Sequence, residues 1–224
     1  MITRMTASIT IIGLALLLLQ GAELHAAVGC SLNDPDRDVK RIFPNSTGYR
    51  SQFITIAERD GQALLAQVEA KLGDKLDAEY ESIDVPYAYY YVLNGKDVIG
   101  YVHGVNAKGM FGGMQVILAT NLDGQIVNMY YQKLSSPESR SFRDKAFTDQ
   151  FVGLSLSDFL HHDAMQGASC PEDKVATIKD PSKNSHDDFL ATIRAIKKNL
   201  ILLDAFILSA KGGQSNQMQK GEKR

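Results

Sequence analysis

The fold is decided by residues 109–153, which read GMFGGMQVILATNLDGQIVNMYYQKLSSPESRSFRDKAFTDQFVG. A glycine-rich start leads into a mostly apolar run at residues 114–119, and a turn at Asp123-Gly124 leads into a second strand-like run at residues 126–131. Two such runs joined by an Asp-Gly turn are typical of a β-hairpin. A Ser-Ser-Pro turn follows, and then phenylalanines recur at helical spacing over residues 141–151. We therefore expect a hairpin with a helix after it.

The flanking sequence predicts the other elements of the same domain. An aromatic-rich strand ends at Asn94-Gly95, a strong hairpin signal, and a partner strand returns after it. Apolar residues at helical spacing precede this hairpin, and a long amphipathic helix begins at Asp187-Asp188 near the C-terminus. The expected ranges are 62–72 for the first helix, 87–93 and 98–105 for the strands, and 187–207 for the last helix. The order predicts an α+β fold in which antiparallel β-hairpins form a sheet packed by N-terminal and C-terminal helices.

Length and composition are those of an ordinary globular protein. The chain has 224 residues, of which 44% are hydrophobic and 22% charged, and its formal net charge is −2. A near-neutral balance gives no basic face for nucleic acid, so nucleic acid is not expected as a partner. We expect one domain over residues 28–211 and a disordered polar tail over residues 212–224.

Residues 1–27 read as an export signal. Arg4 supplies the positive charge, residues 9–19 form an apolar run, and Ala26-Ala27 offer small residues for cleavage. The run is shorter than the roughly 20 residues of a membrane span, although an uncleaved anchor is the alternative. We expect the domain in the periplasm or on the outer face of the cytoplasmic membrane.

The two cysteines, Cys30 and Cys170, leave two interpretations open. Residues 27–30, Ala-Val-Gly-Cys, loosely resemble a lipobox, in which a lipid on Cys30 would attach the protein to the membrane. Alternatively, Cys30 and Cys170 form one disulfide in an oxidising compartment. The two interpretations exclude each other. No Cys-x-x-Cys pair is present, so a cysteine metal site is not expected.

The order of elements in residues 97–208 resembles the FMN-binding domain family of bacterial flavin electron-transfer proteins. The matching segments are Gly112-Gly113, Asp123-Gly124-Gln125-Ile126 and Phe147-x-x-Gln150-Phe151-x-Gly153. The family's Glu-Thr-Pro-Gly loop corresponds to Ser135-Ser136-Pro137-Glu138, which keeps the hydroxyl and the proline but loses the first carboxylate and the glycine.

The family's flavin-attachment motif is altered in this chain. The motif is an Asp or Asn, two residues, and then Ser-Gly-Ala-Thr-x-Thr-Ser at the start of a helix, and in many members its first Thr carries FMN through a phosphoester. Residues 184–196 read NSHDDFLATIRAI. In one register Asn184 matches, Leu190 replaces the acceptor and Thr192 is the second Thr. In the other register Thr192 is the acceptor but the helix slips by two residues. Neither register restores the glycine, and Asp187-Asp188 would repel a phosphate, so we expect no covalent flavin.

The resemblance implies an exported protein that holds FMN non-covalently and exchanges electrons with a membrane or periplasmic redox protein. It implies an electron carrier or accessory subunit, with no catalytic residue assigned. The cofactor-binding residues implied are Gly112, Gly113, Ser136, Pro137, Asn184, Ser185 and Thr192. The alternative is a cofactor-free binding or assembly module on the same fold.

Other residues have simpler interpretations. On the residues alone, the glycines at 109, 112 and 113 indicate a tight turn. His161-His162 would diverge along the chain, so we expect a surface turn and no metal site there. Tyr87, Tyr89 and Tyr91 share one sheet face, where they could stack on a flavin ring, but core packing is the simpler expectation.

Overall fold

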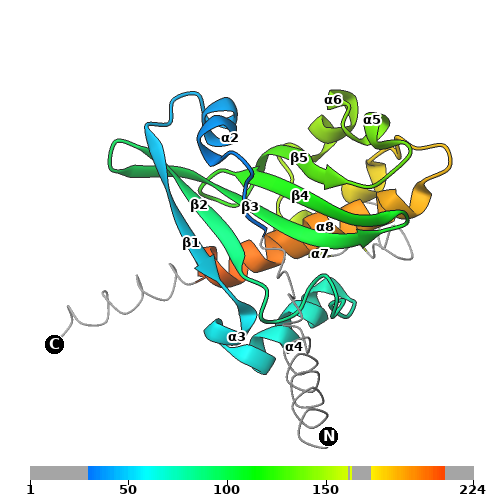
Figure 1. The fold of residues 1–224 in the computed structure, drawn as a ribbon, viewed down its shortest axis with the longest axis horizontal. Helices are drawn as coiled ribbons and strands as arrows, with labels where there is room; N and C mark the ends of the chain where they lie inside the picture. Colours follow the sequence, from blue (N-terminus) through cyan, green and yellow to red (C-terminus); the bar gives the residue numbers. More distant parts are fainter. Residues whose placement is uncertain (1–29, 161, 163–172, 210–224) are drawn as a thin grey trace, which may run out of the picture.

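A computed structural model describes residues 30–160, 162 and 173–209 and has the expected α+β fold. The expected export signal at residues 1–27, the tail at residues 212–224 and Cys170 lie outside the described residues. A five-stranded antiparallel sheet has its strands side by side in chain order (Figure 1). The strands are β1 (Gly48–Ile54), β2 (Tyr87–Asn94), β3 (Asp97–Gly109), β4 (Gly112–Thr120) and β5 (Ile126–Leu134).

Both expected hairpins are confirmed. Gly95, with φ of 61°, closes the turn between β2 and β3, and Gly124, with φ of 78°, closes the turn between β4 and β5. These left-handed conformations favour glycine, which explains the Asn-Gly and Asp-Gly signals. β1 was not expected from the sequence, because most of its residues are exposed and its apolar pattern is weak.

The helices agree with the sequence where their apolar periodicity is long. They are α2 (Pro35–Ile42), α3 (Ile56–Arg59), α4 (Gly61–Leu72), α5 (Ser139–Phe142), α6 (Lys145–Thr148), η1 (Asp149–Phe151), α7 (Leu156–Leu160), η2 (Val175–Thr177), α8 (His186–Leu203) and η3 (Asp204–Leu208), the last a π-helical turn. Within the described ranges, no helix combines the length and apolarity needed to cross a membrane.

Two segments differ from the expected helices. The single helix expected over residues 141–151 is three short turns, because the Asp144 side chain accepts a hydrogen bond from the Ala146 N–H and begins a new turn. The turn-rich region before β1 contains α2, whose start is fixed by the Asp34 side chain and by Pro35 in the first turn.

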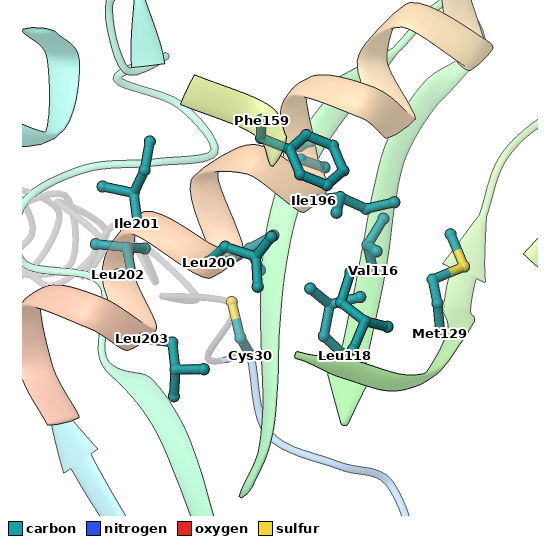
Figure 2. Close-up of a cluster of buried hydrophobic side chains, with 14 of the residues drawn as sticks. Cys30, Val116, Leu118, Met129, Phe159, Ile196, Leu200, Ile201, Leu202 and Leu203 are labelled. Carbon is teal, nitrogen blue, oxygen red and sulfur yellow. The ribbon is translucent and has the colours of Figure 1, made fainter. Parts of the chain in front are cut away.

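The sheet has a buried layer on each face. On one face, α8 packs along β3 and β4, and Figure 2 shows Leu200 and Ile196 of α8 near Val116 of β4. Tyr87 and Tyr89 are fully buried in this layer and contact Phe206, which confirms core packing. The other face carries a smaller cluster around Val39 of α2.

A buried ion pair joins α8 to the sheet. The Lys198 ammonium, fully buried, donates to the Glu81 carboxylate and to the backbone oxygen of Asn106. Arg194, one turn earlier, donates to both Glu81 oxygens, at 2.9 and 3.1 Å. Burial acts to raise the pKa of the Glu81 carboxyl, but Lys198 and Arg194 outweigh it and hold that pKa below its usual range. This network connects α8, the β3 backbone and the segment before β2.

A second buried polar contact fixes the protonation of His103. The Asn199 amide NH₂ donates to the backbone oxygens of His103 and Val116, so its oxygen faces His103 Nδ1. The imidazole therefore carries its proton on Nδ1 and stacks on the Tyr89 ring at 4.0 Å between centroids. Burial lowers the pKa of His103 to about 3, so folding requires the neutral ring.

We predict that His103 makes the fold sensitive to acid. Its pKa is lower in the folded chain than in the unfolded chain, so stability is unaffected above about pH 6.5 and falls as pH decreases toward the folded value. Between pH 6.5 and 4.5 this residue should cost about 2 kcal/mol of unfolding free energy. Urea titrations of the wild type and His103→Gln should show a smaller loss in the variant. His186→Gln, at an exposed histidine, is the control. Equal acid losses in the wild type and His103→Gln would contradict the prediction.

Candidate functional site

The tip of the β3–β4 hairpin lies against the start of α8. Gly109 and Gly112 form the last pair of the two strands, and Met110 and Phe111 make an exposed two-residue tip. A Cβ on Gly109 would lie 2.6 Å from Asp188 Oδ1, and Gly112 has φ of 126°. These glycines are therefore required for the turn and for close approach to α8.

The loop after β5 joins this hairpin to the segment before α8. The Ser135 hydroxyl donates to the Gly113 backbone oxygen at 3.2 Å. The Glu138 carboxylate accepts hydrogen bonds from the backbone N–H groups of Lys183 and Asn184, at 3.0 and 2.9 Å. Three segments far apart in sequence thus meet at one end of the sheet. Six of the predicted cofactor residues belong to them: Gly112, Gly113, Ser136, Pro137, Asn184 and Ser185.

The chain's own carboxylates take up backbone N–H groups at this position. Besides Glu138, Asp188 in the first turn of α8 is fully buried, and its Oδ1 accepts from the Met110 N–H at 2.7 Å. The N–H groups of Asn184 and Lys183 hold the pKa of Glu138 below its usual range, so it is an anion at neutral pH. Backbone N–H groups near a helix start would otherwise bind a phosphate. In this structure, the Glu138 and Asp188 carboxylates occupy the position that a phosphate would otherwise take.

Thr192, the seventh predicted cofactor residue, is fully buried. Its hydroxyl donates to the Asp188 backbone oxygen at 2.7 Å and accepts from the Tyr131 hydroxyl at 2.8 Å. Both hydrogen-bonding roles of the hydroxyl are thus filled within the protein. In this arrangement, Thr192 joins α8 to β5 and presents no surface to a ligand.

A cavity of about 630 Å³ lies beside the hairpin tip and the first turns of α8. Its wall includes apolar groups of Met110, Leu190 and Ala191. The charged groups on the wall balance, with three cations and three carboxylates: Lys75, Lys108, Arg194, Asp74, Asp77 and Asp187. Arg194 already contacts Asp74 and Glu81, so it is not free to bind an anion. The volume is within the range of small-molecule sites.

Sequence reasoning did not identify the residues that line this cavity. Leu190, Ala191 and Arg194 follow one another at helical spacing on α8, and this spacing indicates a shared helix face. Nothing in the sequence brings that face next to residues 74–77, because the contact depends on Glu81 and Arg194 meeting in the folded chain.

The histidine region differs from the surface turn that we expected. His162 is buried, and its Nδ1 lies 2.7 Å from an oxygen of the buried Asp173. His161 and residues 163–172 are outside the described part of the chain. Among the residues that are described, no group of three His, Cys, Asp or Glu side chains could hold a metal ion.

Cys30 is a core residue. Its side chain is fully buried, and Figure 2 shows its sulfur directed toward α8 near Leu200. Burial raises the pKa of the thiol to about 11, so it is protonated and poorly nucleophilic at neutral pH. A lipid on this sulfur would require residues around Cys30 to leave the core. The disulfide with Cys170 stays a prediction, because Cys170 is outside the described residues.

Comparison of the chain with protein-family models finds no match, and comparison with curated proteins finds none.

We predict that Thr192 contributes to stability through the Tyr131 hydroxyl. Thr192→Val leaves the buried Tyr131 hydroxyl without its acceptor and should lower the unfolding free energy by about 1–3 kcal/mol. Thr192→Ser keeps the hydroxyl and is the control. In a double-mutant cycle, adding Tyr131→Phe to Thr192→Val should recover part of the loss, because both polar partners are then gone. Additive losses in the cycle would contradict a direct interaction.

Proposed function

We propose that the chain is an exported protein that binds FMN non-covalently and transfers electrons to or from a membrane or periplasmic redox protein. The observation that carries the proposal is the cavity of about 630 Å³ between Gly109-Met110 of the hairpin tip and the first turns of α8. The loop after β5 and the segment before α8 contact the same hairpin or each other, but they and the seven predicted cofactor residues do not line this cavity. The family resemblance assigned these three segments to flavin binding, although they are far apart in sequence.

The two parts of FMN fit the residues present to different extents. The apolar groups of Met110, Leu190 and Ala191 suit a planar ring, and the cavity has room for one. The phosphate does not fit against the start of α8, because Glu138 holds the N–H groups of Lys183 and Asn184 and the Asp188 carboxylate lies in the first turn, where it accepts from the Met110 N–H. Lys75 and Lys108 at the cavity wall are the cations available to a phosphate that points away from α8.

The flavin itself would supply the redox chemistry, while the chain positions and shields it. Met110 and Phe111, at the exposed hairpin tip beside the cavity, would cover one side of the ligand. The balanced charges of the wall would give the site little attraction for a free phosphate. Most of the binding free energy would therefore come from contacts with the flavin ring.

The second candidate is a cofactor-free binding or assembly module. It is favoured by the two carboxylates that lie where the resemblance would place a phosphate: Glu138, which accepts from the Asn184 N–H just before α8, and Asp188 in the first turn of α8. In this candidate the fold is kept, and the cavity beside the hairpin tip binds no flavin. The same experiment separates the two candidates.

The test is titration of the purified mature protein with FMN and with riboflavin, followed by flavin fluorescence. We expect saturable binding of both, with affinities within about threefold of each other, because the phosphate contributes little when carboxylates occupy the start of α8. Ala191→Phe should fill the cavity and abolish binding of both ligands. The matched control is Ala66→Phe on the exposed face of α4.

Binding that survives in Ala191→Phe would contradict the proposal that this cavity holds the flavin. FMN binding far tighter than riboflavin binding would contradict the closed anion site. Absence of binding of either ligand, in protein that is folded by circular dichroism and carries no flavin from its host, would overturn the flavin proposal in favour of the cofactor-free module.

A further inference from the structure

A second cavity of about 630 Å³ lies between α2, β5 and the α5–α6 segment, and it shares no residue with the cavity beside α8. Figure 1 shows α2 and α6 with β5, an edge strand of the sheet, between them. Its wall is predominantly polar and includes Asn33, Asn128, Tyr130 and Gln132. The proposed flavin function does not involve these residues.

This cavity concentrates positive charge. Four cationic side chains line it, Arg37, Arg41, Arg143 and Lys145, against two carboxylates, Asp38 and Asp149. The whole chain has a formal net charge of −2, so the positive surplus is a local feature. A cleft lined by one sign of charge attracts ligands of the opposite sign.

The carboxylates neutralise only part of this charge. Arg37 lies between two carboxylates, Asp34 and Asp38, each at 3.6 Å. Asp38 also contacts Arg41 at 3.4 Å and accepts from the Tyr130 hydroxyl at 3.0 Å. Asp149 contacts Lys145 at 2.7 Å. Within the described ranges, no carboxylate forms an ion pair with Arg143, whose guanidinium donates to the Tyr131 backbone oxygen. Arg143 thus keeps N–H groups for another acceptor.

Two of the guanidinium groups are held over aromatic rings. Arg41 lies over the Tyr130 ring, with its guanidinium carbon 4.8 Å from the centroid, and Arg143 lies over the Tyr131 ring at 5.9 Å. Tyr130 is itself fixed by its hydrogen bond to Asp38. A guanidinium that is already positioned loses less entropy when it binds an oxyanion, and its planar fork matches phosphate oxygens.

Asn128 also lines the cavity, but its side-chain oxygen is buried without accessible surface and without a hydrogen-bond partner among the described residues. The groups that can reach an anion in this cavity are therefore the cationic side chains.

We propose that the cleft between α2, β5 and α6 binds a phosphate-bearing anion, with Arg41 and Arg143 as its principal ligands. The phosphate can belong to a small soluble molecule or to the headgroup of an anionic lipid. Both present the same oxyanion chemistry to the two guanidinium groups.

The test is isothermal titration calorimetry of the mature protein with inorganic pyrophosphate at low ionic strength. We expect one saturable site whose affinity falls as salt is added. Arg143→Gln and Arg41→Gln should each weaken binding about tenfold or more, because each removes charge-assisted hydrogen bonds. Arg59→Gln, at an exposed arginine on α3, is the matched control and should bind like the wild type. Arg143→Lys, which keeps the charge without the fork, should be intermediate.

A second arm identifies the source of the phosphate. Sedimentation with phosphatidylglycerol vesicles, compared with phosphatidylcholine vesicles, supports a lipid headgroup if binding requires Arg41 and Arg143. Binding of pyrophosphate alone supports a soluble ligand. Failure to bind both pyrophosphate and anionic vesicles would overturn the proposal. Binding that is equally strong in folded Arg41→Gln, Arg143→Gln and wild-type protein would overturn it as well.

Discussion

The structure depends on the burial of the Lys198 ammonium between α8 and the sheet. Its charge is removed from water and compensated by Glu81 and by the Asn106 backbone oxygen. Removing one partner of such a pair leaves an uncompensated buried charge, which is far costlier than the loss of a surface ion pair. Glu81 also accepts from Arg194, which in turn contacts Asp74. The network therefore sets where α8 lies against β3 and where residues 74–81 lie against α8. The cavity beside the hairpin tip is the space that these contacts leave.

The start of α8 limits how a flavin can bind beside it. A helix start with free N–H groups suits a phosphate, but Glu138 and Asp188 supply anions from within the chain. Thr192, which the family resemblance placed near the cofactor, is engaged with Tyr131 and the α8 backbone. What is left for a ligand is an apolar cavity with balanced charges. By contrast, the local positive surplus lies along the β5 edge of the sheet, around Arg41 and Arg143. The two cavities therefore suit different chemistry.

The sequence predicted the elements whose signals are local. The Asn-Gly and Asp-Gly turns identified both hairpins, and the apolar periodicity of α4 and α8 was long enough to be read directly. It did not predict β1, which pairs with β2 through backbone hydrogen bonds while exposing most of its side chains. Nor could it predict the closed anion site, because Glu138 and Asn184 are 46 residues apart and meet only in the folded chain. The resemblance grouped three segments that meet in the folded chain, and the tertiary contacts determine what each residue does there.

The most direct test of the central claim is the unfolding free energy of Glu81 and Lys198 variants, measured by urea titration at pH 7. Glu81→Ala leaves the Lys198 ammonium buried without its carboxylate and should cost about 3–5 kcal/mol. Glu81→Leu combined with Lys198→Met replaces the charges by apolar groups and should be clearly more stable than Glu81→Ala. A loss below about 0.5 kcal/mol in Glu81→Ala, the range of an ordinary surface substitution, would contradict the claim that this buried pair holds α8 on the sheet.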